Sequence, residues 1–347
     1  MRPLVCLAAL VLLARALNAA PDSLLVVEPV LAMRADTLPP SVVVRTPRAD
    51  TAGEASGRRF HAGRFYYGVG AVVAADAVVM VGLSDLWYTE RVPFHWYADS
   101  GQYSTGIPDD GWLDDWHTYA QMDKGGHLFV AWELARAAGA YGRWSGLSDR
   151  KAGLFGATLS AAFQSQIELF DGFDPAYGAS RTDLAANVLG AALGGAQVAY
   201  PERLGGFAPK LSYHRSPYYD RTISPAAPLN YAGNVVKDYD GLSYWLAVRP
   251  AALGAPAWWP RWLGAAVGYG ADGLAHPVSG IGADGASDGP KHTRQLYLSL
   301  DLDVLTTERD RLPRALRPVA AFLSFVRVPF PALELGGRGA RWHWLYY

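Results

Sequence analysis

Polar and ionisable residues gather in three separate segments of the sequence, each with the spacing of a helix. Asp123 and His127 are four residues apart, and so are Asp183 and Asn187. Residues at this spacing share one face of an α-helix. Glu168 lies on a similar polar face in the segment between them. If the three helices pack together, one site collects seven polar side chains: Asp123, Lys124, His127, Glu168, Asp171, Asp183 and Asn187.

Two kinds of chemistry suit this set of side chains. Carboxylates and an imidazole together can hold a divalent metal ion through oxygen and nitrogen ligands, with water in an open position. Alternatively, His127 acts as a general base on water after Asp123 or Asp183 has oriented its ring. The candidate catalytic residues are therefore His127, Glu168 and Asp183, and the candidate binding residues are Asp123, Lys124, Asp171 and Asn187.

Each of these residues also has a purely structural interpretation. Asp123 can serve as the N-cap of its helix, where its carboxylate satisfies backbone donors. Ser180 and Asp183 fit a capping box in outline, with Asp in place of the usual Glu. Lys124 can be a buried counter-ion for Glu168. Several ionisable groups among apolar helices are nevertheless costly to bury, which favours a functional site when they are taken together.

The composition excludes several classes of protein. The 347-residue chain is 50% hydrophobic and 18% charged, so it is not a disordered chain. A formal net charge of -1 gives no basic surface for nucleic acid. The sequence contains no H-E-x-x-H or P-loop motif. Its G-x-S-x-G stretch (Gly285–Gly289) and its G-x-G-x-x-G stretches (Gly268–Gly273 and Gly280–Gly285) do not open a predicted helix, so we expect no nucleotide cofactor. The length predicts two packed units.

The first twenty residues have the plan of a secretory signal peptide. A basic start at Arg2 precedes an apolar run from Leu4 to Leu13, and Ala14-Arg15-Ala16 offers a cleavage site. The only cysteine, Cys6, lies in this segment, so the mature chain would have no thiol. Residues 21–58 contain Pro39-Pro40 and lack helical periodicity, which predicts a linker.

Residues 59–204 read as a helical domain rich in alanine and glycine. The predicted helices are Phe65–Trp87, Lys124–Tyr141, Lys151–Phe170 and Arg181–Tyr200. The first is long enough to cross a membrane but carries Asp76 and Asp85, so a transmembrane span and a buried helix of a periplasmic bundle both remain open. Gly190 and Gly194 would let the last helix approach a neighbour closely.

Residues 205–347 change to a period of two, which indicates strands. Leucines at alternate positions of Gln295–Asp303 lie on one face, and polar residues lie on the other. Two architectures compete: a closed outer-membrane barrel, and the antiparallel sheet beside the helices that we favour, which makes the fold α+β. The other predicted elements are strands Lys210–His214, Ser243–Arg249, Trp262–Ala271 and Arg341–Tyr347, and a short helix at Pro313–Val326.

The polar motifs resemble those of the YfiM-like family of periplasmic proteins, a domain of unknown function. They are Asp123-Lys124-x-x-His127, Glu168-x-x-Asp171-Gly172-Phe173 and Gly178-x-Ser180-x-x-Asp183-x-x-Ala186-Asn187-x-x-Gly190. Segments outside this stretch, such as Lys237-Asp238-Tyr239-Asp240-Gly241 and Tyr244-Trp245-Leu246, match the longer members as well. The resemblance implies a place in the envelope and supplies no established reaction.

A weaker similarity reaches the VanZ-like membrane proteins, which share the order of an Asp-Lys-x-x-His start, a Glu-bearing helix and a D-x-x-x-N-x-x-G helix. It implies a VanZ-like four-helix bundle. This sequence departs from their pattern at Asp171, where glutamine is usual, and it lacks an arginine before the last motif.

We therefore expect an exported cell-envelope protein, in the periplasm or at the outer membrane. Its partner would be an envelope membrane or lipid, and its polar cluster, with a possible divalent metal, would bind or process an envelope lipid or glycan component. The alternative is a non-catalytic scaffold, in which the buried ions only fix the packing of the helices.

Overall fold

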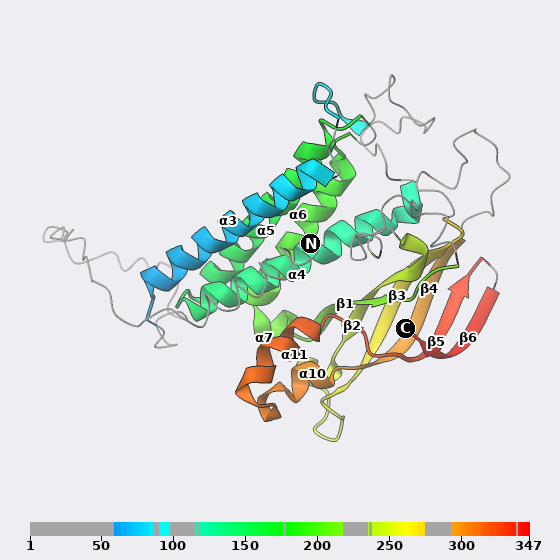
Figure 1. Cartoon of the computed structure of the whole chain (residues 1–347). Helices are drawn as coiled ribbons and strands as arrows, with labels where there is room; N and C mark the ends of the chain where they lie inside the picture. The colour runs from blue at the N-terminus through cyan, green and yellow to red at the C-terminus, as the bar shows by residue number, and fades with distance from the viewer. Residues whose placement is uncertain are drawn as a thin grey trace, which may run out of the picture.

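The structure is a computed structural model of the whole chain (Figure 1). It describes residues 59–86, 90–97, 116, 118–175, 178–217, 235, 238–274, 293–337 and 339–347. The expected signal peptide at 1–20 and linker at 21–58 lie outside the described residues. The described part contains seven α-helices and, in its C-terminal half, a six-stranded antiparallel sheet, so the α+β expectation is confirmed.

Three helices form the centre of the helical part: α4 (Met122–Trp144), α5 (Asp149–Asp171) and α6 (Arg181–Ala199). They pack against one another over most of their length, and glycines at their crossings bring the backbones close together. A Cβ atom on Gly190 would lie 2.2 Å from the Leu128 carbonyl oxygen, and one on Gly194 would lie 2.3 Å from that of Trp132. The close approach predicted from these two glycines is confirmed.

The fourth helix, α3 (Ala62–Leu86), runs along the outside of the other three (Figure 1). Its first turn contacts α5 through the rings of Phe65 and Phe155, and Gln166 of α5 donates a hydrogen bond to Asp76 at 2.8 Å. The stretch Ala62–Gly82 is long and apolar enough to cross a membrane, and 6% of it is buried. The buried-helix interpretation is therefore wrong, because a core helix would be mostly covered.

The sheet is a meander in which each strand pairs with the next along the chain. Its strands are β1 (Phe207–Tyr213), β2 (Leu242–Val248), β3 (Leu263–Asp272), β4 (Thr293–Leu302), β5 (Phe330–Gly336) and β6 (Gly339–Tyr346). Four predicted strands lie within a few residues of β1 to β4, and the predicted last strand corresponds to β6, whereas β5 was missed. Among the described strands no ladder joins β1 to β6, so the structure has the open sheet rather than the closed barrel.

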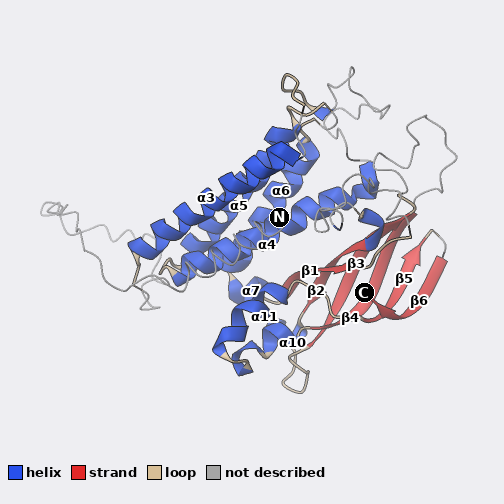
Figure 2. Cartoon of the chain, in the orientation of Figure 1, coloured by secondary structure: helices blue, strands red, loops and turns tan. Residues whose placement is uncertain are grey.

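Three short helices complete the described part of the chain, and Figure 2 shows them together at one end of the sheet. They are α7 (Pro201–Leu204), α10 (Val304–Thr307) and α11 (Arg317–Leu323). The helix predicted at Pro313–Val326 is therefore shorter than expected, and it follows a 3-10 turn at Arg314–Leu316.

The sheet touches the helices where α4 begins. The Tyr244 ring of β2 packs on Gly125 and Gly126, so closely that a Cβ atom on Gly125 would lie 2.7 Å from it. The Tyr269 hydroxyl of β3 donates a hydrogen bond to the Ala120 carbonyl oxygen. These contacts fix the position of the first turn of α4, which carries two of the predicted site residues, Asp123 and Lys124, and is followed one turn later by His127.

Candidate functional site

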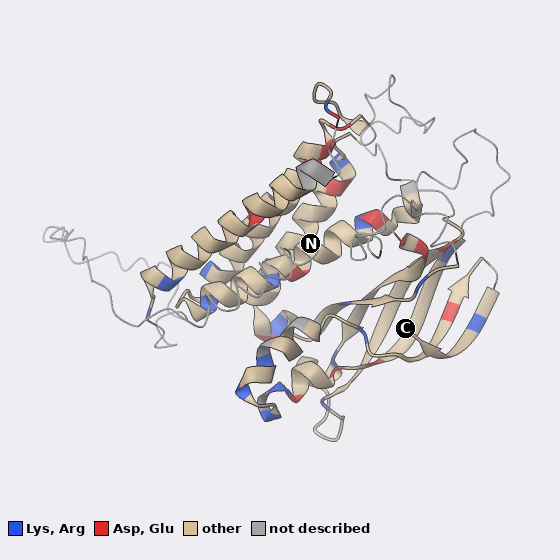
Figure 3. Ribbon diagram, viewed as in Figure 1, with Lys and Arg blue, Asp and Glu red and all other residues tan. Residues whose placement is uncertain are grey.

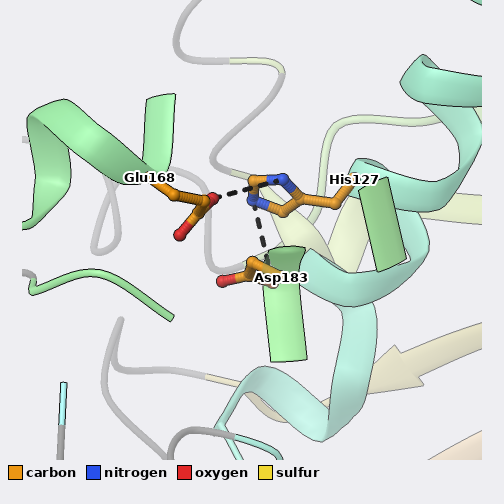
Figure 4. A group of neighbouring side chains, drawn as sticks. All are labelled: His127, Glu168 and Asp183. Carbon is orange, nitrogen blue, oxygen red and sulfur yellow. Dashed lines mark ion pairs between the residues drawn. The ribbon is translucent and has the colours of Figure 1, made fainter. Parts of the chain in front are cut away.

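Three of the predicted residues meet in one place, each from a different helix. His127 of α4, Glu168 of α5 and Asp183 of α6 point toward one another (Figure 4). His127 Nδ1 lies 3.6 Å from Glu168 Oε1, and His127 Nε2 lies 3.8 Å from Asp183 Oδ1. One ligand atom from each residue falls within 4.8 Å of the others, which is the arrangement of a candidate metal centre.

The backbone before α4 has an unusual conformation. Tyr119, Ala120 and Gln121 have φ angles of 47°, 50° and 64°, in the left-handed region that non-glycine residues seldom adopt. Such a run costs free energy and persists only where surrounding contacts hold it, as the Tyr269 hydroxyl does at Ala120. The N-cap of α4 is Gln121, so the prediction that Asp123 caps this helix is wrong.

Glu168 is held by the start of the next helix. Ser180 caps α6 by accepting a hydrogen bond from the Asp183 amide at 3.0 Å, which is the first of the two hydrogen bonds of the predicted capping box. The Ser180 amide donates to Glu168 Oε2 at 3.1 Å. The other carboxylate oxygen, Oε1, is buried and accepts no hydrogen bond within the described part of the chain. Glu168 thus presents one oxygen to the site while the other fixes its orientation.

The hydrogen bonds of Asn187 fix the state of the His127 ring. The Asn187 side chain donates to the Gln164 carbonyl oxygen and accepts from the Gln164 side chain, both at 3.4 Å, which orients its amide. Its oxygen then accepts from His127 Nδ1 at 3.1 Å. Nδ1 therefore carries the hydrogen, and Nε2 keeps a lone pair for a metal ion or a proton.

Lys124 joins two acidic residues at the edge of the cluster. Its ammonium group lies 2.9 Å from Asp123 Oδ2 and 2.9 Å from Asp183 Oδ1, and all three side chains are nearly buried. The sequence had suggested Lys124 as a counter-ion for Glu168. Its positive charge does act on Glu168, but its ion pairs are with the two aspartates.

The environment of Glu168 favours its protonated form. Burial raises the pKa of this carboxyl from 4.5 to about 10, and the nearby negative charges of Asp183 and Asp171 add to the effect. The hydrogen bond from the Ser180 amide and the charge of Lys124 oppose it only in part. Such a shift is typical of functional sites, where charges of one sign are crowded together.

Asp171 differs from the other predicted residues in its position. It is the last residue of α5, half-buried, and it acts on the site through its charge rather than as one of the three possible ligands. Two tyrosines from the C-terminal half support the site and were not among the predicted residues: Tyr239, whose ring lies 4.7 Å from that of Tyr119, and Tyr244. The segment of Tyr239 had been noted only through the family resemblance, whereas Tyr244 had been noted through that resemblance and as part of the predicted strand Ser243–Arg249.

A comparison with known protein families finds a match over this part of the chain. Residues 109–198 match a family model described as "Predicted periplasmic lipoprotein (DUF2279)", and the matched range contains α4, α5, nearly all of α6 and every predicted site residue. No curated protein and no solved structure matches the chain. The match is consistent with a place in the cell envelope, and the description names no reaction.

Proposed function

We propose that His127, Glu168 and Asp183 bind a divalent metal ion, and that the site uses it to hydrolyse a component of the cell envelope. The observation that carries this proposal is the convergence of the three ligand atoms within 4.8 Å. Two ligands that each lie about 2.1 Å from a metal ion are at most about 4.2 Å apart. The 3.8 Å between His127 Nε2 and Asp183 Oδ1 satisfies that limit, whereas the 3.6 Å contact of Glu168 is with the other ring nitrogen, Nδ1. Ligand atoms as far apart as 4.8 Å would have to close by about 0.6 Å around an ion.

The charges around the site also favour a cation. Asp123 and Asp183 bring two negative charges against the single positive charge of Lys124. Ionisation of Glu168 would add a third negative charge in a buried place, which explains why its pKa is raised. A divalent ion would compensate this excess, because a bound cation reverses the effect of neighbouring acids on a carboxyl group.

The surrounding residues are arranged to support such a centre. Asn187 holds His127 in the tautomer with a lone pair on Nε2, and the Ser180 amide aims Glu168. A bound divalent ion would act as a Lewis acid and lower the pKa of a coordinated water molecule. Lys124, which lies 2.9 Å from Asp183 Oδ1, holds that carboxylate in place beside His127.

The proposed substrate is an envelope lipid head group or glycan precursor. This part rests on the family description and on the resemblance to YfiM-like and VanZ-like proteins, whose polar motifs coincide with the converging residues. We further propose that residues 59–204, as a VanZ-like helical domain, carry the chemistry and that residues 205–347 form a second, β-rich domain.

The proposal is tested by measuring metal in the purified full-length protein. We expect about one bound ion per chain by elemental analysis, and titration with Zn²⁺ or Mn²⁺ should show a single site. His127→Ala and Asp183→Asn should each remove it. His343→Ala is the matched control, because His343 Nε2 pairs with Glu334 at 2.6 Å in the sheet without belonging to a group that could hold a metal.

Two results would contradict the proposal. One is a wild-type protein that binds neither metal; the other is equal binding by wild type and His127→Ala. If His127→Ala and Asp183→Asn lower only the melting temperature, the polar cluster is the scaffold that fixes helix packing. For the hydrolytic step, the metal-loaded protein should release soluble products from envelope extracts, and Glu168→Gln should not.

A further inference from the structure

The inner face of the sheet carries charged residues together with a buried cluster of small and aromatic residues. One row of paired residues crosses it as Lys210, Trp245, Gly268, Tyr297 and Glu334, all on the same face. Several charged side chains on this inner face are buried: Lys210, only 1% exposed, lies 2.6 Å from Asp301 and 3.4 Å from Asp303. The inner face therefore holds buried ion pairs within the core of the sheet.

The opposite face is apolar and exposed. The neighbouring row runs through Leu246, Val267, Leu298, Leu333 and Trp342, one residue from each of β2 to β6. More than a third of the surface of most residues on this face is exposed: Leu246, Val267, Leu296, Leu298, Leu300, Leu335, Trp342 and Trp344. Soluble monomers seldom expose an apolar surface of this extent.

Charge is almost absent from this outer face. Among its residues on the described strands only Arg294 is charged, and it lies at one end of β4, where it donates a hydrogen bond to Gln121. Figure 3 shows charged residues gathered instead around α10, α11 and the start of α4. An exposed apolar face with almost no charge, opposite a buried face that carries the ionised residues, is unusual for a soluble protein and is the pattern of strands that face lipid.

Two further features match a bilayer. Strands β3 and β4 have 10 residues each, the length of a tilted strand that crosses the hydrocarbon layer. Tryptophans cluster at the end of the sheet where β2 joins β3 and β6 ends, with Trp258 75% and Trp344 81% exposed. Tryptophan favours the boundary between hydrocarbon and water.

Some backbone N–H and C=O groups at the two edges of the sheet also have hydrogen-bond partners, which they need in contact with lipid. The amide of Leu211 in β1 donates to the Phe325 carbonyl oxygen at 2.7 Å, and the Arg327 amide donates back to Leu211 at 2.8 Å. The Arg327 guanidinium donates to the carbonyl oxygen of Tyr346 in β6 at 3.0 Å. Residues 325–327 thus form hydrogen bonds with both edge strands, β1 and β6.

We propose that the outer face of β2 to β6 lies against the hydrocarbon of a phospholipid bilayer. Helix α3 supports the same environment independently, because its apolar stretch is exposed along its length. This inference does not depend on the metal centre, since it concerns other residues on the other half of the chain.

Spin labels on single cysteines test the proposal directly. Cys6 is the only native cysteine, so a Cys6→Ser background leaves one label per protein. The full-length protein is reconstituted in vesicles of phosphatidylethanolamine and phosphatidylglycerol. Labels on Val267→Cys and Leu298→Cys should collide readily with oxygen, which dissolves in lipid, and rarely with a water-soluble nickel chelate.

Two control positions define the alternatives. Ser299→Cys, next to Leu298 but on the inner face, should be protected from both reagents, and Arg311→Cys, whose side chain is 84% exposed, should react with the nickel chelate. Nickel access at Val267 and Leu298 equal to that at Arg311 would overturn the proposal, and so would failure to enter vesicles. Protection of both outer positions from both reagents would instead assign the face to protein contact, such as a second copy.

Discussion

At the scale of single residues, Glu168 links the structure of the site to its chemistry. One of its oxygens is fixed by the backbone at the start of α6, and the other faces His127. Burial and the charges of Asp183 and Asp171 keep it protonated near neutral pH when no cation is bound. A metal ion would have to displace that proton, so metal binding should strengthen as the pH rises.

The same carboxyl predicts how stability depends on pH. Its pKa is 4.5 in the unfolded chain and about 10 in the folded, metal-free protein, so between these values the folded state holds a proton that the unfolded state has lost. The stability that comes from the Glu168 proton is fully present below the pKa of the unfolded chain and is lost above the pKa of the folded protein. The free energy of unfolding should fall by up to about 1.4 kcal/mol for each pH unit between them.

Urea unfolding of the metal-free protein at several pH values measures this slope. Glu168→Gln is the comparison, because it keeps the shape of the side chain and removes its titration. The slope should be steeper in wild type than in Glu168→Gln, and equal slopes would mean that Glu168 is ionised in the folded protein.

At the scale of helices and strands, small residues set the geometry of the site. Gly190 lies one turn beyond Asn187 and packs on the Leu128 carbonyl oxygen, next to His127. In Gly190→Ala the new methyl group would lie 2.2 Å from the Leu128 carbonyl oxygen, which is too close. The substitution should therefore lower the free energy of unfolding by about 1–3 kcal/mol and move α4 away from α6. Thermal unfolding should show the loss of stability, and metal affinity should fall with it.

Gly70→Ala is the control for this substitution, because nothing lies within 4 Å of a Cβ atom at Gly70 of α3. It should stabilise the protein or leave it unchanged, since alanine favours a helix over glycine by about 0.5–1 kcal/mol. An equal loss of stability in both variants would show that the crossing of α4 and α6 is not sensitive to side-chain volume.

The sequence predicted these elements unevenly, for physical reasons. Helical periodicity placed the four long helices to within a few residues, and polar spacing brought His127, Glu168 and Asp183 to one site. Strand β5 was missed because Pro331 interrupts a short alternation, although Leu333 and Leu335 do alternate with Glu334. The left-handed turn before α4 could not be predicted from Tyr119 and its neighbours, since contacts from a distant strand hold it.

At the scale of the whole molecule, the sheet contacts the helical site at one end of its outer face, where α4 begins. There Tyr244 and Tyr269 are covered by the start of α4, whereas Leu246 and Val267, the next outer residues along the strands, remain exposed. The surface assigned to lipid is therefore continuous with the one that positions the first turn of α4. A change in the sheet at this end should therefore affect the proposed metal centre without altering His127, Glu168 or Asp183.

Tyr269→Phe tests that connection. It removes only the hydroxyl that donates to the Ala120 carbonyl oxygen, so it should cost about 1 kcal/mol of stability and loosen the left-handed turn that leads to His127. We expect weaker metal binding in a titration with Zn²⁺. Tyr213→Phe, on the same sheet, loses a comparable hydrogen bond of 3.2 Å to Asp238 and should cost similar stability while leaving the affinity unchanged. If both variants bind metal as wild type does, the sheet supports the helices without positioning the site, and the two parts of the chain work separately.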